Sequence, residues 1–309
     1  MQARVSVIFP VFQRPEYLRE AIESILRQTL QDFELIVIDD GSGPDAAQLL
    51  DTYEDPRIRL IRFPVNLGVS AARNAGLKYA RAPFVALMDS DDVAQPERLA
   101  IQFDWLDGHP DLTVCGSHAI KFFPDGRRQP MRYPETDAII KANLLLVDSA
   151  ILNGTVMFRT AFAREHKLLY DSNFNVDEDH MFFVSMMLAG ATFGTLSVPL
   201  LHYRRHAENV TFDETVQDDG KTAVRARLLP EFFPSLTGDE GKLLLKAMRR
   251  KVETTVRESC GAVAAFDKAM QESRSFFGED RAHINRILER QVGTLMAAIK
   301  RANRVGATV

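Results

Sequence analysis

One short stretch constrains the fold of this chain more than any other. Residues 84–88 (Phe-Val-Ala-Leu-Met) have the length of a buried strand and stop at three carboxylates, Asp89, Asp91 and Asp92, before a helix start at Pro96. Ligands of open α/β sheets bind outside the carboxyl ends of the strands, where carboxylates can hold a hard cation. Any single one of these acids could instead end the strand or cap the helix, but three crowded acids repel one another unless a cation offsets their charge.

The whole-chain composition is that of an ordinary globular protein. The 309 residues are 46% apolar and 26% charged, and the net charge of -4 argues against a general nucleic-acid binder. The two cysteines, Cys115 and Cys260, form neither a disulfide framework nor a zinc cluster, and we expect both in the core. No leader precedes the first expected strand and no apolar run is long enough to cross a bilayer, so we expect a cytoplasmic protein.

The first part of the chain alternates expected strands and helices. Strands are expected at 5–9, 33–38, 57–63 and 84–88, and helices at 15–28, 45–53, 71–81 and 96–106. Pro10 is expected to end the first ladder because proline lacks a donor, and Ser70 to cap the third helix. This alternation predicts a mostly parallel α/β sheet with right-handed crossovers. The second strand also ends in acids, at Asp39 and Asp40.

The pattern of the next hundred residues is mixed. Strands are expected at 112–123, 127–133, 155–158, 191–198 and 200–204, and helices at 137–147, 161–167 and 181–188. From about residue 216 helical periodicity dominates. We therefore divide the chain into a domain at 1–215, with halves 1–110 and 111–215, and a helical C-terminal region at 216–309.

The helical region carries two apolar stripes at helical spacing. Their members are Leu244, Met248, Val252 and Val256 in one stripe, and Ile284, Leu288, Leu295 and Ile299 in the other. Three interpretations remain open for these stripes. They pack a small bundle within the chain, they join copies into a homo-oligomer, or they attach the protein peripherally to the inner face of an anionic membrane.

Four motifs, in this order, carry a resemblance to a known family. They are residues 5–10 (Val-Ser-Val-Ile-Phe-Pro), 34–42 (Glu-Leu-Ile-Val-Ile-Asp-Asp-Gly-Ser), 66–74 (Asn-Leu-Gly-Val-Ser-Ala-Ala-Arg-Asn) and 88–92 (Met-Asp-Ser-Asp-Asp). Together they resemble the family-2 glycosyltransferases of the GT-A fold, over the first two thirds of the chain. The resemblance implies an inverting enzyme of polysaccharide biosynthesis. It would transfer a sugar from a nucleoside-diphosphate sugar, UDP-linked, to a hydroxyl of a saccharide, glycan or polymer acceptor.

The same resemblance implies roles for residues of the donor site. Asp40 accepts a hydrogen bond from the uracil ring, the backbone near Pro10 borders the nucleoside, and Asp89 lies near the ribose. Asp91 holds Mn²⁺ or Mg²⁺ against the diphosphate. Arg73, near the start of an expected helix, suits an anion, although an ordinary surface ion pair is the alternative.

An acidic pair before the buried helix supplies the candidate general base. By the family pattern Asp179 takes the proton of the acceptor hydroxyl while the metal stabilises the departing diphosphate, with Glu178 as the rival for this role. The alternative is that these acids only charge a helix start.

A later basic cluster, residues 202–206 (His-Tyr-Arg-Arg-His), resembles the late basic motif of the family. We assign Arg204 to the diphosphate and His206 to the metal, with His202 as the alternative ligand.

Two features depart from the family pattern, and two other functions compete. Phe12-Gln13 replaces an aromatic-Asn pair at the edge of the nucleoside site, and residues 152–159 carry no acceptor signature.

Asp89 and Asp91 also match the Asp-x-Asp-x-Val motif of haloacid-dehalogenase-like phosphatases, but that family places it after its first strand. The other alternative is a non-catalytic sugar-nucleotide-binding scaffold. Donor sugar, acceptor and linkage are not legible in the sequence.

Overall fold

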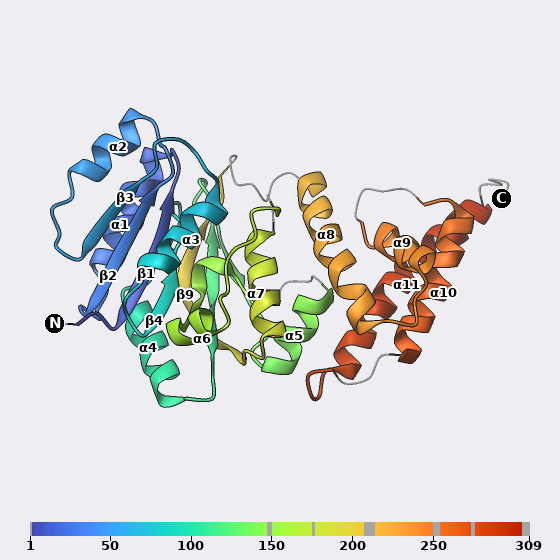
Figure 1. Ribbon diagram of the computed structural model, residues 1–309. Coiled ribbons are helices and arrows are strands. Elements are labelled where there is room, and N and C mark those ends of the chain that lie inside the picture. Colours follow the sequence, from blue (N-terminus) through green and yellow to red (C-terminus); the bar gives the residue numbers. More distant parts are fainter. Residues whose placement is uncertain are drawn as a thin grey trace. The chain divides into compact units, whose positions relative to one another are not determined.

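A single mixed sheet organises the first of two compact units in this computed structural model (Figure 1). The structure describes residues 2–146, 150–174, 177–206, 214–249, 254–272 and 276–304. The first unit contains residues 1–140 and 149–209, and the second contains residues 141–148 and 210–309. The described strands are β1 (Val5–Val11), β2 (Phe33–Asp39), β3 (Ile58–Arg62), β4 (Phe84–Leu87), β5 (Val93–Ala94), β6 (Val114–Phe122), β7 (Arg128–Met131), β8 (Met157–Arg159) and β9 (Phe193–Arg204).

Four parallel strands, in the order β3-β2-β1-β4, form the half of the sheet that the alternating pattern predicted. The apolar residues of β1, β2 and β4 are almost completely buried, as expected for strands covered on both faces, whereas those of the edge strand β3 are half-buried. The expectation that Pro10 ends β1 was wrong, because the strand continues to Val11. β4 ends opposite Ile8, so Pro10 lies beyond the last pair on that side and its missing donor interrupts no hydrogen bond there.

The other half of the sheet is mixed, as predicted. β8 runs antiparallel to β4 and β6, β9 runs parallel to β6, and the hairpin partner β7 is antiparallel to β6. The two strands expected at 191–198 and 200–204 are one strand, β9. The register with β6 shifts around His118, which stands opposite Pro199, so an irregularity accommodates the proline without ending the strand. The two-residue β5, at the edge beside β9, was not predicted.

Seven α-helices and one 3₁₀ turn connect the described strands. They are α1 (Pro15–Leu26), α2 (Pro44–Asp51), α3 (Val69–Tyr79), α4 (Arg98–Gly108), α5 (Asp137–Leu146), η1 (Asn153–Thr155), α6 (Thr160–Glu165) and α7 (Glu178–Leu188). Residue 147, the expected end of α5, lies outside the described residues.

Two expectations about single residues were wrong. Helix α3 begins at Val69, so Ser70 lies inside the helix; Gly68, with φ 90°, takes the cap position. A positive φ is easily adopted by glycine but not by residues with a side chain, so the cap falls there. Cys115 is buried in the core, whereas Cys260 is exposed.

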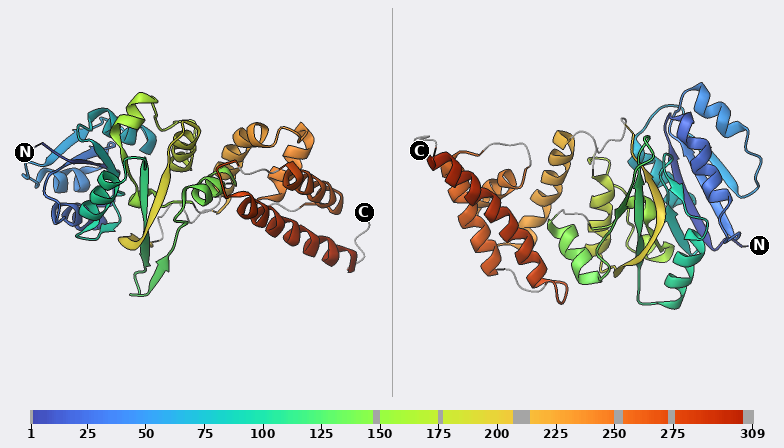
Figure 2. Two further views of the ribbon diagram at one scale, coloured as in Figure 1. Left: turned by 90° about the horizontal axis from the view of Figure 1, so that it is seen from below. Right: turned by 180° about the vertical axis from the view of Figure 1, so that it is seen from behind.

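The second unit is helical, as predicted for the C-terminal region. It contains α8 (Glu214–Phe232), α9 (Gly238–Ala247), α10 (Val256–Glu272) and α11 (Arg281–Arg304). Thr237 and Glu240 form a capping box that fixes the start of α9. α10 packs against α9 and α11 and runs alongside α11 (Figure 1, Figure 2).

The apolar stripes of this unit are largely buried in the single chain. Their buried members are Leu244, Met248, Ile284, Leu288 and Leu295. Val252, another expected member, lies outside the described residues. Packing within the chain therefore accounts for these five positions. None of the described helices is both long and apolar enough to span a bilayer.

Candidate active site

The carboxyl end of β2 holds a buried carboxylate, as the sequence predicted for Asp40. Its Oδ1 accepts a hydrogen bond from Leu67 N (2.7 Å) and its Oδ2 from Gly68 N (2.9 Å). Asp40 therefore fixes the loop that leads into α3. The backbone at Val65 lies close to Gly41, and only a glycine leaves room for it. A Cβ at position 41 would lie 2.4 Å from the carbonyl carbon of Val65.

Arg73 of α3 links two acids that are distant in the sequence. Its Nη1 donates to Glu178 Oε1 (2.6 Å) and its Nη2 to Asp89 Oδ1 (3.0 Å). Burial lowers the pKa of Arg73, but the charges of Asp89 and Glu178 outweigh burial and raise that pKa overall. The side chain is buried, so the alternative of a surface ion pair was wrong.

Asp89, two residues after the end of β4, is also bound by Asn153 of η1. Asn153 Nδ2 lies 3.2 Å from each carboxylate oxygen of Asp89. Next to it, Gly154 allows close approach of the backbone: a Cβ there would lie 3.2 Å from Asp92 Oδ2 and 3.3 Å from Asp89 Oδ2. The Asn-Gly pair thus forms a wall of the acidic site.

The two predicted metal ligands lie in contact. His206 Nε2 is 3.0 Å from Asp91 Oδ2, and the buried imidazole stacks on Tyr17 with ring centroids 4.7 Å apart. Arg14 Nη1 donates to the same oxygen of Asp91 at 3.0 Å. His202, the alternative ligand, lies instead 2.7 Å from Gln95 Nε2, ring nitrogen to amide.

Arg204 supports the loop that carries these acids. Its backbone N donates to Asp92 Oδ1 (2.9 Å), its Nε to the Asp91 carbonyl (2.8 Å) and its Nη2 to Glu20 Oε2 (2.5 Å). The guanidinium also lies over the rings of Tyr17 and Phe122. Through these contacts Arg204 holds the loop that carries Asp91 and Asp92 in place.

Asp92 is the most deeply buried of the three acids beyond β4. Burial raises the pKa of Asp92 well above its usual value, and the negative charges of Asp91 and Asp89 raise it further. Its Oδ2 has no hydrogen-bond partner among the residues that the structure describes.

The acidic pair at the start of α7 divides into two different environments. Glu178 is buried against Arg73; burial and the charge of Asp179 raise the pKa of Glu178 to about 7, although Arg73 opposes the shift. Asp179 is only half-buried, and its Oδ1 accepts a hydrogen bond from His180 N at 2.7 Å. Asp179 forms no salt bridge with a described residue.

The donor set would suit a divalent cation bound through two protein ligands. A carboxylate oxygen and an imidazole nitrogen, from Asp91 and His206, meet at 3.0 Å, and Mn²⁺ accepts both kinds of ligand. No group of three His, Cys, Asp or Glu side chains arranged for metal binding occurs among the described residues. The remaining positions would be filled by water and phosphate oxygens, as Mg²⁺ sites at phosphates commonly are.

Comparison with known proteins identifies the family. The model of the family described as "Glycosyl transferase family 2" matches residues 6–185, more than half of the chain. The chain belongs to glycosyltransferase family 2. It is 29% identical over 211 residues to an uncharacterized glycosyltransferase, MJ1057, of Methanocaldococcus jannaschii, covering 65% of this chain and 70% of that one.

Solved structures share the fold of this glycosyltransferase. S. aureus TarS 1-349 in complex with UDP-GlcNAc has a TM-score of 0.60 at 20% identity, over 99% of this chain and 92% of that one. The mannosyltransferase PcManGT of Pyrobaculum calidifontis, in complex with GDP-Man and Mn²⁺, has a TM-score of 0.57 at 14% identity, over 100% and 89% of the two chains. The predicted GT-A type fold with a helical C-terminal region is confirmed. Because the chain belongs to a family of glycosyltransferases, it is a glycosyltransferase enzyme. The phosphatase and the non-catalytic scaffold, which were the alternatives, are therefore not supported.

Sequence reasoning missed several residues of this glycosyltransferase site. Arg14 and its neighbour Gln13 both have left-handed backbones, with φ 59° and 60°, which nothing in their residue types signals. Asn153 lies in a stretch where we found no signature. The only available signal was its Asn-Gly dipeptide, which marks a turn in general rather than a contact to Asp89.

Proposed function

We propose that this glycosyltransferase transfers a sugar from a UDP-linked donor to a hydroxyl of a glycan or polymer acceptor, with inversion at the anomeric carbon. The observation that carries the proposal is the Arg73 bridge, which brings Asp89 beyond β4 and the acidic pair of α7 into one cluster. Groups that we assign to the donor and groups that we assign to the acceptor would thereby share one site. The sugar nucleotides bound to TarS and PcManGT, which share this fold, support a nucleotide-sugar donor.

The nucleoside would bind at the carboxyl ends of β1 and β2. Each oxygen of Asp40 accepts one backbone N–H, and a carboxylate oxygen has a second lone pair with which it can accept from the imide of uracil. Pro10 lies on the neighbouring strand at the level of Ile38, one pair before the end of the β1–β2 ladder, and would border the base. Asp89, fixed by Arg73 and Asn153, would contact the ribose.

Asp91 and His206 would hold Mn²⁺ or Mg²⁺. The bound cation supplies positive charge that stabilises the departing diphosphate. Arg204 would act through Asp91, because its guanidinium holds the Asp91 carbonyl and the Glu20 carboxylate. This loop must stay fixed if the ligands are to meet a phosphate in one geometry.

Asp179 is the better candidate for the general base. A base must be ionised and within reach of the acceptor hydroxyl. Glu178 is buried and bound to Arg73, whereas Asp179 is half-buried, forms no salt bridge with a described residue, and accepts a hydrogen bond from His180 N of its own helix. Asp179 takes the hydroxyl proton as the acceptor oxygen bonds to the anomeric carbon. The bond from that carbon to the diphosphate breaks, and nucleoside diphosphate leaves.

A donor screen tests the proposed function. The full-length protein is incubated with Mn²⁺ and a panel of UDP- and GDP-linked sugars, with and without oligosaccharide acceptors, and nucleoside diphosphate release is measured. We expect release from a UDP-sugar that increases with acceptor and stops when a chelator removes the metal. Failure to release nucleoside diphosphate from any donor, or undiminished release in excess chelator, would contradict the corresponding part of the proposal.

A further inference from the structure

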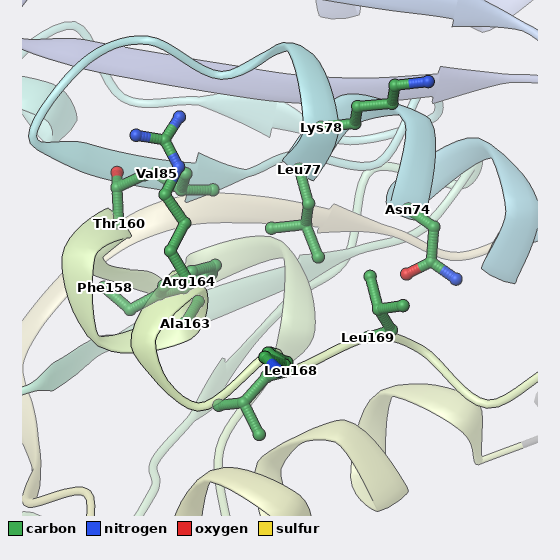
Figure 3. Close-up of a pocket in the computed structure, with 11 residues that line it drawn as sticks. Asn74, Leu77, Lys78, Val85, Phe158, Thr160, Ala163, Arg164, Leu168 and Leu169 are labelled. Carbon is green, nitrogen blue, oxygen red and sulfur yellow. The ribbon is translucent and has the colours of Figure 1, made fainter.

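A cavity of about 270 Å³ lies between α3 and α6, over β4 and β8 (Figure 3). The residues that line it are Asn74, Leu77, Lys78, Val85, Phe158, Thr160, Ala163, Arg164, Lys167, Leu168 and Leu169. None of the acids of the active site is among them. We call this cavity the α3–α6 pocket.

The walls of the α3–α6 pocket are mainly apolar. Leu77 projects into it from α3, and Leu169 approaches from the segment after α6 (Figure 3). Leu169 is 61% exposed, which leaves a large apolar side chain in water when the pocket is empty. The volume lies just below the range of about 300–1,000 Å³ for small-molecule sites, so it suits an alkyl segment better than a sugar nucleotide.

The pocket is preformed rather than a gap between loose side chains. Asn74 Nδ2 donates to the Tyr170 carbonyl (2.9 Å), and Tyr170 N donates to Asn74 Oδ1 (2.8 Å). These two bonds hold the segment that carries Leu168 and Leu169 against α3. A preformed site loses less conformational entropy when a ligand binds.

The lining residues include three exposed cations, Lys78, Arg164 and Lys167. They include no acidic residue. None of the three forms a salt bridge with a carboxylate in the described part of the chain; Arg164 Nη2 donates to the Ala80 carbonyl. Lys78 and Arg164 lie in the last turns of their helices, where a cation is favourable in any protein. Lys167 lies beyond the end of α6, so the favourable placement of cations in a last helical turn does not explain its presence. Its backbone is left-handed, with φ 52°.

We propose that the α3–α6 pocket binds an alkyl chain that ends in a phosphate group. The chain would lie against Leu77, Phe158 and Leu169. The phosphate would lie at the rim, where Lys78 and Arg164 stand on opposite sides of Leu77 and a flexible lysine can turn toward it (Figure 3). Three positive charges, with no acid among the lining residues, complement a dianionic head, and the fork of an arginine matches phosphate oxygens. This site is separate from the donor site and does not depend on the proposed transfer reaction.

Calorimetry with octyl phosphate, below its aggregation concentration, tests the pocket. Octanol supplies the tail without the head, and inorganic phosphate supplies the head without the tail. We expect octyl phosphate to bind at least 10-fold more tightly than either. Equal affinity for octanol and octyl phosphate, or no binding of octyl phosphate, overturns the proposal. Binding to anionic vesicles without binding of octyl phosphate also overturns it, because it indicates attraction to a charged surface alone.

Two variants locate the site. Lys78→Gln combined with Lys167→Gln removes two rim charges and leaves the Arg164 hydrogen bond intact, and Ala163→Leu fills the pocket from α6. We expect each to weaken octyl phosphate binding at least 10-fold. The matched control, Lys300→Gln with Arg301→Gln, removes two exposed charges from α11 and should bind like wild type. Thermal melting verifies that each variant folds. Unchanged affinity in both folded pocket variants contradicts the assignment.

Discussion

Arg73 Nη1 lies 2.6 Å from Glu178 Oε1, although 105 positions separate the two residues in the sequence. Both side chains are buried, and Arg73 also holds Asp89 at 3.0 Å. One cation therefore compensates carboxylates from the end of β4 and from the start of α7. The geometry of the site depends on this bridge, because desolvated acids at close range otherwise repel.

Removal of Arg73 should destabilise the fold as well as the site. Arg73→Met leaves Glu178 buried without its cation, and loss of one partner of a buried pair costs about 3–5 kcal/mol. Urea unfolding at pH 8 measures this loss. The double variant Arg73→Met with Glu178→Gln serves as the control and should recover part of it. A single variant as stable as wild type would mean that the bridge does not contribute to folding.

The raised pKa of Glu178 predicts a pH-dependent stability. In the unfolded chain this group titrates near 4.5, and in the folded protein near 7. Between these values the folded protein binds more protons at Glu178, so its contribution is complete below pH 4.5 and is lost as pH rises through 7. Relative to Glu178→Gln, the unfolding free energy of wild type should therefore fall by about 3 kcal/mol at most across this interval. Parallel pH profiles of the two proteins would refute the shift.

Arg14 should compete with the metal for Asp91. Its guanidinium donates to the same carboxylate oxygen that faces His206, so Arg14→Gln should raise Mn²⁺ affinity several-fold. Asp91→Asn should lower that affinity at least 10-fold, because it removes an anionic ligand. Titration of free Mn²⁺ by electron paramagnetic resonance, in the presence of UDP, gives these affinities.

Arg19→Gln, at an exposed position of α1, the helix that begins directly after Arg14, is the matched control for Arg14→Gln and should leave Mn²⁺ affinity unchanged. Equal affinities in wild type, Arg14→Gln and Asp91→Asn would remove the cation from this position.

The sequence was most informative where one strand delivers a residue directly. The parallel strands and their acidic ends at Asp40 and Asp89 follow from apolar runs that stop at carboxylates, a pattern that local sequence carries. Contacts between distant segments were not readable. The Asn153 contact to Asp89 depends on how η1 packs beside β4, and the position of Arg14 depends on a left-handed backbone.

The length of β9 is a second feature that local sequence did not predict. A proline normally interrupts a ladder, and the two strands expected at 191–198 and 200–204 are separated by Pro199. Pairing with β6 across an irregular register at His118 overrode that rule. Local propensity is a weak guide where a long partner strand is available on the neighbouring side.

The role of Asp179 separates transfer from mere binding of a nucleotide sugar. Asp179→Asn keeps the shape of the side chain and removes its basicity, and Glu178→Gln is its matched neighbour. The decisive measurement is the initial rate of sugar transfer by these variants, with the UDP affinity of each determined by calorimetry on the same preparations. We predict that Asp179→Asn lowers transfer by about 10²- to 10⁴-fold with UDP affinity unchanged, while Glu178→Gln retains more activity. Wild-type transfer rates in both variants would contradict the mechanism, and the reverse ranking would assign the base to Glu178.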